Sequence, residues 1–158
     1  MKSRTLSKKE RNKVNNAVKE MYDVEVIDEA SIVRVIEYSE GDIISCDGSP
    51  AFIKKDSDYV PVLAYLLRNA VFTKQIRIDM GGVKPISGGA DVMVPGIVGV
   101  DDVEVGDIAT VVDENHGKPL SVVKVVMDKD DIQSSTNGVA AESIHNIGDD
   151  IWKFTKTL

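Results

Sequence analysis

From residue 74 onward, glycine and proline divide the chain into β-rich stretches that are too short for anything but a small, sharply turned sheet. Strands are predicted at residues 75–79, 92–94, 108–112, 120–127, 139–143 and 151–154, with 120–127 the longest. Single helical turns are predicted at residues 83–87 and 128–133. Many short strands with regular turn signals between them are typical of a small barrel or sandwich.

The residues before position 74 have a different pattern, which begins with a helix signal. Ser7 and Glu10 have the spacing of a capping box, and an apolar stripe at helical spacing follows, so residues 7–22 are predicted to be helical. Strands are predicted at residues 24–27, 32–38, 43–46 and 51–54, and a second helix at 59–70 with Asp58 as its N-cap.

Together the two patterns predict an α+β fold with two domains. We expect an α+β domain at residues 1–73 and a β-rich domain at residues 74–158. Because no flexible linker separates them, we also expect the two domains to pack against each other.

The charge of the chain is unevenly distributed. The net charge is −7, yet residues 1–20 hold seven basic and only two acidic side chains. The basic N-terminal helix could contact phosphate, although charge alone favours an ordinary solvated helix face. The acidic remainder argues against general, sequence-independent attraction to nucleic acid.

Several kinds of chemistry find no support in the residues. A lone cysteine, Cys46, excludes an internal disulfide and a multi-cysteine zinc site, which fits a reducing cytosol. The longest apolar run, near residues 92–100, is far shorter than the roughly 20 residues that span a bilayer, and no secretory signal is visible. We therefore expect a cytoplasmic protein with no membrane contact and no cofactor.

Side chains able to act as catalysts are few. His116 lies in a predicted hairpin turn, where we expect it to be exposed and idle, and His145 lies among apolar residues, where we expect a partly buried, hydrogen-bonded side chain. The acidic pairs at 101–102, 130–131 and 149–150 are interpreted as solvated turns rather than a hard-cation site. An enzyme whose catalytic groups meet only in the fold remains an alternative, but we predict no catalysis.

The glycine-rich stretch at residues 81–89 is the feature closest to a binding motif. It lacks both the phosphate-loop spacing and the Gly-x-Gly-x-x-Gly spacing. Glycines nevertheless permit a close backbone approach, and a short helix after Gly81-Gly82 would offer free amides to an anion. The surroundings are locally basic, with Lys74, Arg77 and Lys84 against Asp79 and Asp91. The alternative is that these glycines only form barrel corners.

Three segments carry a resemblance to a known family. They are Ile-Asp-Met-Gly-Gly-Val at residues 78–83, Gly-Ala-Asp-Val-Met-Val-Pro-Gly-Ile at 89–97 and Val-Gly-Asp-Ile-Ala at 105–109. They resemble the PUA domain, an RNA-binding module, and the similarity extends over roughly residues 74–154. It implies a pseudobarrel of about six strands, in which the short helix, the Gly-Ala-Asp strand and the closing strand form the RNA face.

The flanking residues are similar to the malignant-T-cell-amplified-sequence family of translation factors, in which a pre-PUA domain precedes PUA. Residues 137–152 resemble its C-terminal signature, and Tyr-Val-Pro-Val-Leu at 59–63 resembles its proline-containing helix start. The resemblance implies binding to rRNA of the small ribosomal subunit or to a tRNA acceptor end, with a partner protein, in initiation, reinitiation or recycling. A single-chain version of archaeal type is expected.

The resemblance also implies where RNA would bind. Lys84, Ser87, Gly88 and Gly89 would lie at the RNA backbone, helped by Lys74 and Arg77 and by the amides beside the glycines, and Asp91 and Met93 would border a pocket for a terminal or unstacked nucleotide. A larger footprint would include Lys118, Lys124 and Lys153. We assign Trp152, Ile144 and Ile147 to the core.

The sequence departs from the family at three positions. Gly82 stands where alanine is usual, Pro85 interrupts the short helix, and Val123 replaces a glycine near the RNA face. The last departure and the acidic composition leave an alternative open, a protein–protein adaptor that has kept the fold and lost RNA affinity. An accessory role in ribosome biogenesis or RNA modification is a further alternative.

Overall fold

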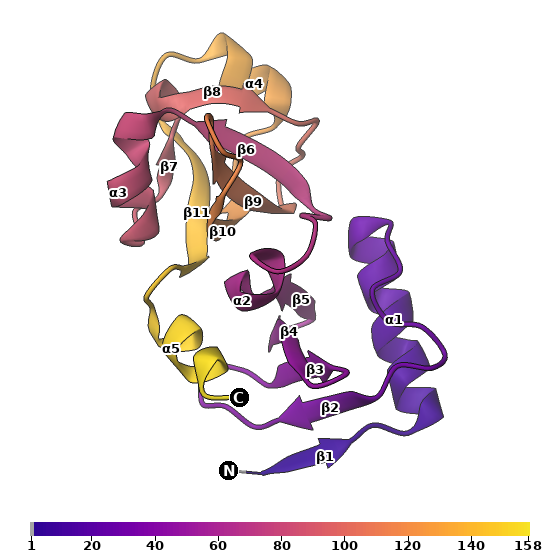
Figure 1. Ribbon diagram of the computed structural model, residues 1–158. Helices are drawn as coiled ribbons and strands as arrows, with labels where there is room; N and C mark the ends of the chain where they lie inside the picture. The colour runs from indigo at the N-terminus through magenta and orange to yellow at the C-terminus, as the bar shows by residue number, and fades with distance from the viewer. Residues whose placement is uncertain (1) are drawn as a thin grey trace.

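Two β-sheets organise the structure, a computed structural model that describes residues 2–158 (Figure 1). The first sheet has the order β1-β2-β3-β4-β5 and is antiparallel throughout. The second has the order β7-β11-β10-β9-β6-β8, and only its β6–β9 pair is parallel. Figure 1 shows this mixed sheet curling into a nearly closed barrel. The α+β fold class and the six-stranded pseudobarrel are confirmed.

One long helix packs against the first sheet. Its elements are β1 (Ser3–Thr5), α1 (Lys8–Tyr22), β2 (Val33–Ile36), β3 (Ile43–Cys46), β4 (Ser49–Lys55), β5 (Asp58–Pro61) and α2 (Leu63–Leu66). The predicted capping box is present, because the Glu10 amide donates to Ser7 Oγ at 3.2 Å and the Ser7 amide donates to Glu10 Oε1 at 3.1 Å. Val14 and Val18 on α1 are buried in a cluster around Phe52.

Two predictions in this half are wrong. Residues 24–27 form no strand. The segment predicted as a helix at 59–70 is instead the edge strand β5, followed by the single turn α2. Tyr59 and Val60 pair with Lys54 and Ile53 of β4, so the backbone that a helix would have used is already hydrogen-bonded in the sheet. Asp58 starts this strand rather than capping a helix.

The second sheet follows after residue 73. Its elements are β6 (Lys74–Ile78), η1 (Met80–Gly82), α3 (Val83–Ser87), β7 (Val92–Met93), η2 (Val94–Gly96), β8 (Ile97–Val100), β9 (Ile108–Asp113), β10 (Pro119–Val125), α4 (Lys129–Ser134), β11 (Val139–Asn146) and α5 (Asp150–Lys156). Its valine- and isoleucine-rich interior includes Ile76, Val111 and Val123, all less than 1 % exposed.

The end of the chain differs from the prediction. Residues 151–154 lie in helix α5 and not in a strand, because the Asp149 side chain accepts from the Trp152 amide and caps the helix. The longest strand is β11, with eight residues, and not the segment at 120–127. Among residues 2–158, no helix is both long and apolar enough to cross a membrane.

Helix α5 returns from the second sheet to the first (Figure 1). Ile151 is buried in an apolar cluster with Val60 and Leu63 from the first half and with Ile108 and Val122 from the second. Phe154 stacks on Tyr38 with ring centroids 4.1 Å apart. We propose that the domains divide near residue 73, with α5 binding them together.

Candidate nucleic-acid interface

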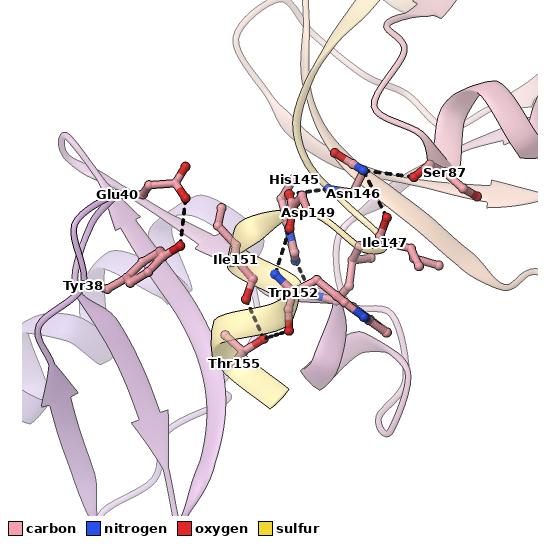
Figure 2. Close-up of polar contacts among 11 residues, drawn as sticks. Tyr38, Glu40, Ser87, His145, Asn146, Ile147, Asp149, Ile151, Trp152 and Thr155 are labelled. Atoms are coloured by element: carbon pink, nitrogen blue, oxygen red, sulfur yellow. Dashed lines mark hydrogen bonds and ion pairs between the residues drawn. The ribbon is translucent and has the colours of Figure 1, made fainter. Parts of the chain in front are cut away.

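A buried histidine connects the two halves of the chain through hydrogen bonds. His145 on β11 is fully buried, and the Leu63 amide at the start of α2 donates to its Nε2 at 3.0 Å. Its Nδ1 therefore carries the proton and donates to Asp149, 2.9 Å from Oδ2 (Figure 2). The predicted hydrogen bonding of this side chain is confirmed, although the side chain is fully and not partly buried. His145 is a structural connection, and it fixes the end of β11 relative to the first domain.

Asp149 is the polar centre of this junction. Besides His145, it accepts from the Trp152 amide at 2.8 Å and the Asn146 amide at 2.9 Å. Burial alone would raise the pKa of Asp149, but the hydrogen bonds from His145 and from the two amides together lower the pKa below its ordinary value. Asp149 is thus a half-buried cap, and the prediction of a solvated acidic turn is wrong for this residue.

The lowered pKa predicts how acid affects the fold. A carboxyl whose pKa is lower in the folded than in the unfolded protein stabilises the fold above its unfolded pKa, and this contribution is lost as the pH falls through the folded value. Stability should therefore decline as the pH drops below about 4. In urea titrations, Asp149→Asn should be less stable at neutral pH and should lose less stability on acidification. A variant with the same acid dependence as the parent would exclude this role.

The predicted RNA-binding residues on α3 and β7 follow β11 along its length, from its end beside α3 to its start, where Met93 pairs with Val139. The Asn146 side chain donates to the Ser87 carbonyl oxygen at 2.9 Å, which ties β11 to the end of α3 (Figure 2). Gly89 has φ +99°, and a Cβ there would lie 3.2 Å from Asn146 Oδ1, so a side chain would be strained and crowded. Asp91 accepts from the Ser143 amide at 2.8 Å. We call this surface, residues 80–93 with Ser143 and Asn146, the α3 edge.

The α3 edge exposes one cation, one carboxylate (Asp91) and two thioethers. Lys84 is exposed on α3, and no hydrogen bond or ion pair of its ammonium is found within residues 2–158. Met80 and Met93 are 44 % and 47 % exposed. The combination of a free ammonium and flexible apolar side chains suits a phosphate next to an unstacked base.

Four of the amides predicted to be free beside the glycines are already hydrogen-bonded. The Gly82 amide donates to Asp79 Oδ1 at 2.9 Å, and the Val83 amide donates to the Met80 carbonyl oxygen. The Gly88 and Gly89 amides donate to carbonyl oxygens of α3. These glycines therefore shape the edge without offering amides to a ligand.

The other predicted cations are dispersed. Lys74 pairs with Asp107 at 3.1 Å, Arg77 with Asp101 at 3.2 Å and Lys124 with Asp58 at 3.6 Å. These three are thus neutralised by carboxylates away from the α3 edge. Lys153 is exposed on α5.

Lys118 lies in the turn between β9 and β10, close to the α3 edge. The Glu114 amide in that turn donates to the Ile78 carbonyl oxygen, immediately before η1. Asp113 accepts from the His116, Asn115 and Lys118 amides, which shapes the turn and lowers the pKa of this carboxyl. His116 is exposed there, as predicted.

The structure changes the predicted roles of Val123 and Asp101 and adds two residues to the site, Asn146 and Ser143. Val123 is fully buried in the barrel core and is not part of the surface. Asp101 accepts from the Gln75 amide at 2.8 Å besides pairing with Arg77, so it belongs to the β6–β8 side and is not merely a solvated turn. Asn146 and Ser143 were not predicted at all, although both lie in the 137–152 signature.

A groove of about 850 Å³ lies between α1 and the β6–β9 side of the barrel. Five of its lining side chains are acidic and one is basic, namely Glu20, Asp23, Asp58, Asp101, Asp107 and Lys74. Within the described part of the chain, no group of three or more His, Cys, Asp or Glu residues is placed to hold a metal ion. The groove is thus more acidic than the α3 edge, whose charged side chains are Lys84 and Asp91.

Comparison with protein families divides the chain as the two sheets do. Residues 74–147 match the PUA domain, and residues 4–69 match a domain of unknown function, DUF1947. An uncharacterised protein of Methanocaldococcus jannaschii is 34 % identical over 152 residues, covering 94 % of each chain.

Two relatives have descriptive names. Translation machinery-associated protein 20 of Saccharomyces cerevisiae is 28 % identical, covering 83 % of this chain and 77 % of the relative. Malignant T-cell-amplified sequence 2 of Homo sapiens is 27 % identical, covering 79 % and 71 %. A crystal structure of a hypothetical protein from Pyrococcus horikoshii has a TM-score of 0.88 and 28 % identity, covering 98 % of this chain and 99 % of the other.

Proposed function

The chain belongs to the family of PUA proteins that carry a DUF1947 domain before the PUA domain, and we propose that it is a non-enzymatic RNA-binding protein of the translation machinery. The translation role is supported by the name of the yeast relative, translation machinery-associated protein 20. The RNA role is supported by the PUA match and by the α3 edge.

The exposed Lys84 on α3, unpaired within the described residues, is the observation that carries the proposal, and Met80 and Met93 are exposed on the same α3 edge. Of the other predicted cations, Lys74, Arg77 and Lys124 are paired with carboxylates, Lys118 is not paired within residues 2–158, and Lys153 lies on α5 outside the barrel. A phosphate approaching the barrel would therefore meet its strongest attraction at α3. The neighbouring thioethers supply apolar contact for a base.

We propose structured RNA with an unpaired end as the ligand, either rRNA of the small ribosomal subunit or a tRNA acceptor end. In this assignment Lys84 and Lys118 contact phosphates, and Ser87, Gly88 and Gly89 give the backbone room to approach. Met93 borders the pocket for an unstacked nucleotide, and Asp91 positions β11 beside it. The protein would act in the cytoplasm with a partner protein, in initiation or recycling.

A salt titration tests this function. Binding of tRNA and of small-subunit rRNA fragments should weaken with salt, and each phosphate contact should contribute about −0.7 to −0.9 to the slope of log affinity against log salt. Because only two lysines that are unpaired in the described part of the chain, Lys84 and Lys118, are proposed to contact phosphates, we expect a small slope of log affinity against log salt. Binding that is undetectable at low salt would contradict the proposal.

The acidic groove favours a second candidate, an adaptor that docks a basic protein segment between α1 and the barrel. Glu20 and Asp23, the two carboxylates of the groove that form no ion pair within residues 2–158, would attract such a segment. Pull-down with and without nuclease separates the candidates, because a directly docked protein partner remains bound after nuclease treatment.

A further inference from the structure

A smaller cavity, of about 290 Å³, lies on the first domain between the β3–β4 turn, α2 and α5. Figure 1 shows α5 beside α2, below the barrel. The residues that line this cavity include Tyr65, Arg68 and Asn69 at α2, and Trp152 and Lys156 on α5.

The charge of this cavity is opposite to that of the chain. Arg68 and Lys156 line it, and no aspartate or glutamate side chain does. The chain as a whole has 26 acidic and 19 basic residues, and the larger groove beside α1 has five carboxylates to one lysine. The lining side chains of this cavity therefore have a net positive charge, on a protein whose overall charge is negative.

Trp152 gives the cavity an aromatic wall. The indole is only partly buried, so the assignment of Trp152 wholly to the core is incomplete: one part packs on the cluster around Ile151 and another lines the cavity. Lys156 Nζ lies 4.6 Å from the centre of the Trp152 ring. Leu67, at the rim, is 38 % exposed.

We propose that this cavity binds one unstacked nucleotide of single-stranded RNA, with the base stacked on Trp152 and its phosphate between Arg68 and Lys156. Stacking of a base on an aromatic ring is stronger than an exposed cation–π contact, so the base can displace the Lys156 ammonium. The displaced ammonium then pairs with the phosphate, and Arg68 offers a fork of donors. The ligand class rests on the proposed RNA function, but the surface is separate from the α3 edge.

The single tryptophan of the chain makes the test direct. Titration of the full chain with a short oligoadenylate should quench Trp152 fluorescence, and quenching should saturate together with binding followed by anisotropy of the labelled oligonucleotide. Arg68→Gln should weaken the quenching interaction about tenfold, as expected for loss of a charged hydrogen bond. Lys54→Gln is the matched control, because Lys54 also lies over an aromatic ring, Tyr59, outside the cavity.

The outcomes separate this proposal from the RNA function. If RNA binds and Lys84→Glu weakens it, but Trp152 is not quenched and Arg68→Gln binds like the parent, the nucleotide site is excluded and the function stands. If no RNA binds, both fail. If inorganic phosphate competes as well as adenosine monophosphate does, the site recognises a bare anion, and base stacking is excluded.

Discussion

Replacing His145 by alanine is expected to lower the free energy of unfolding by about 3 kcal/mol. The change leaves the buried Leu63 amide without an acceptor and opens a cavity between the two domains. It also removes a donor from Asp149, the cap of α5. Urea denaturation at neutral pH measures the loss.

His116→Ala is the matched control for this prediction. His116 is the other histidine of the chain and is exposed in the β9–β10 turn, where its side chain is expected to contribute almost nothing to stability. The two variants should therefore differ by nearly the full effect. Equal stability of both would mean that the hydrogen bonds of His145 do not hold the domains together.

Reversing the charge at Lys84 is expected to reduce RNA affinity about tenfold at moderate salt, because one phosphate contact is lost and a like charge faces the backbone. The slope of log affinity against log salt should fall in magnitude by about 0.7 to 0.9. Lys84→Glu leaves folding intact, since the side chain is exposed on α3. Filter binding with tRNA and rRNA fragments measures both quantities.

Lys129→Glu carries the same change in net charge and serves as the control. Lys129 lies at the start of α4, away from the α3 edge, where a negative charge is compatible with the helix N-terminus. It should bind RNA almost as the parent does. If both variants weaken binding equally, net charge rather than a local contact governs affinity, and the α3 edge is not the interface.

Local signals predicted local structure well. The capping box at Ser7 and Glu10 and the strand at residues 43–46 both lie in the structure at the predicted positions. The prediction of a helix at 59–70 was wrong. The apolar residues of this segment fit one face of a helix, but its first residues form hydrogen bonds with β4 and are therefore a strand. Pairing with another strand cannot be predicted from the sequence of one segment alone.

In the candidate site, too, local sequence signals could be used for prediction and contacts between distant segments could not. Lys84, Gly89 and Met93 could be chosen from the glycine pattern and the family resemblance, and they lie on one surface. The pairing of Lys74, Arg77 and Lys124 could not be predicted, because each partner carboxylate comes from another part of the chain. The role of Asp79 as a cap, which occupies the Gly82 amide, likewise depends on the geometry of η1.

Photocrosslinking of the full chain to 4-thiouridine-labelled tRNA and rRNA fragments, with the attached peptides mapped by mass spectrometry, tests the central claim most directly. RNA at the α3 edge should attach to peptides that contain residues 80–93 or 139–146, and Lys84→Glu should diminish these adducts. Adducts confined to the basic helix α1, unchanged in Lys84→Glu, would contradict the account.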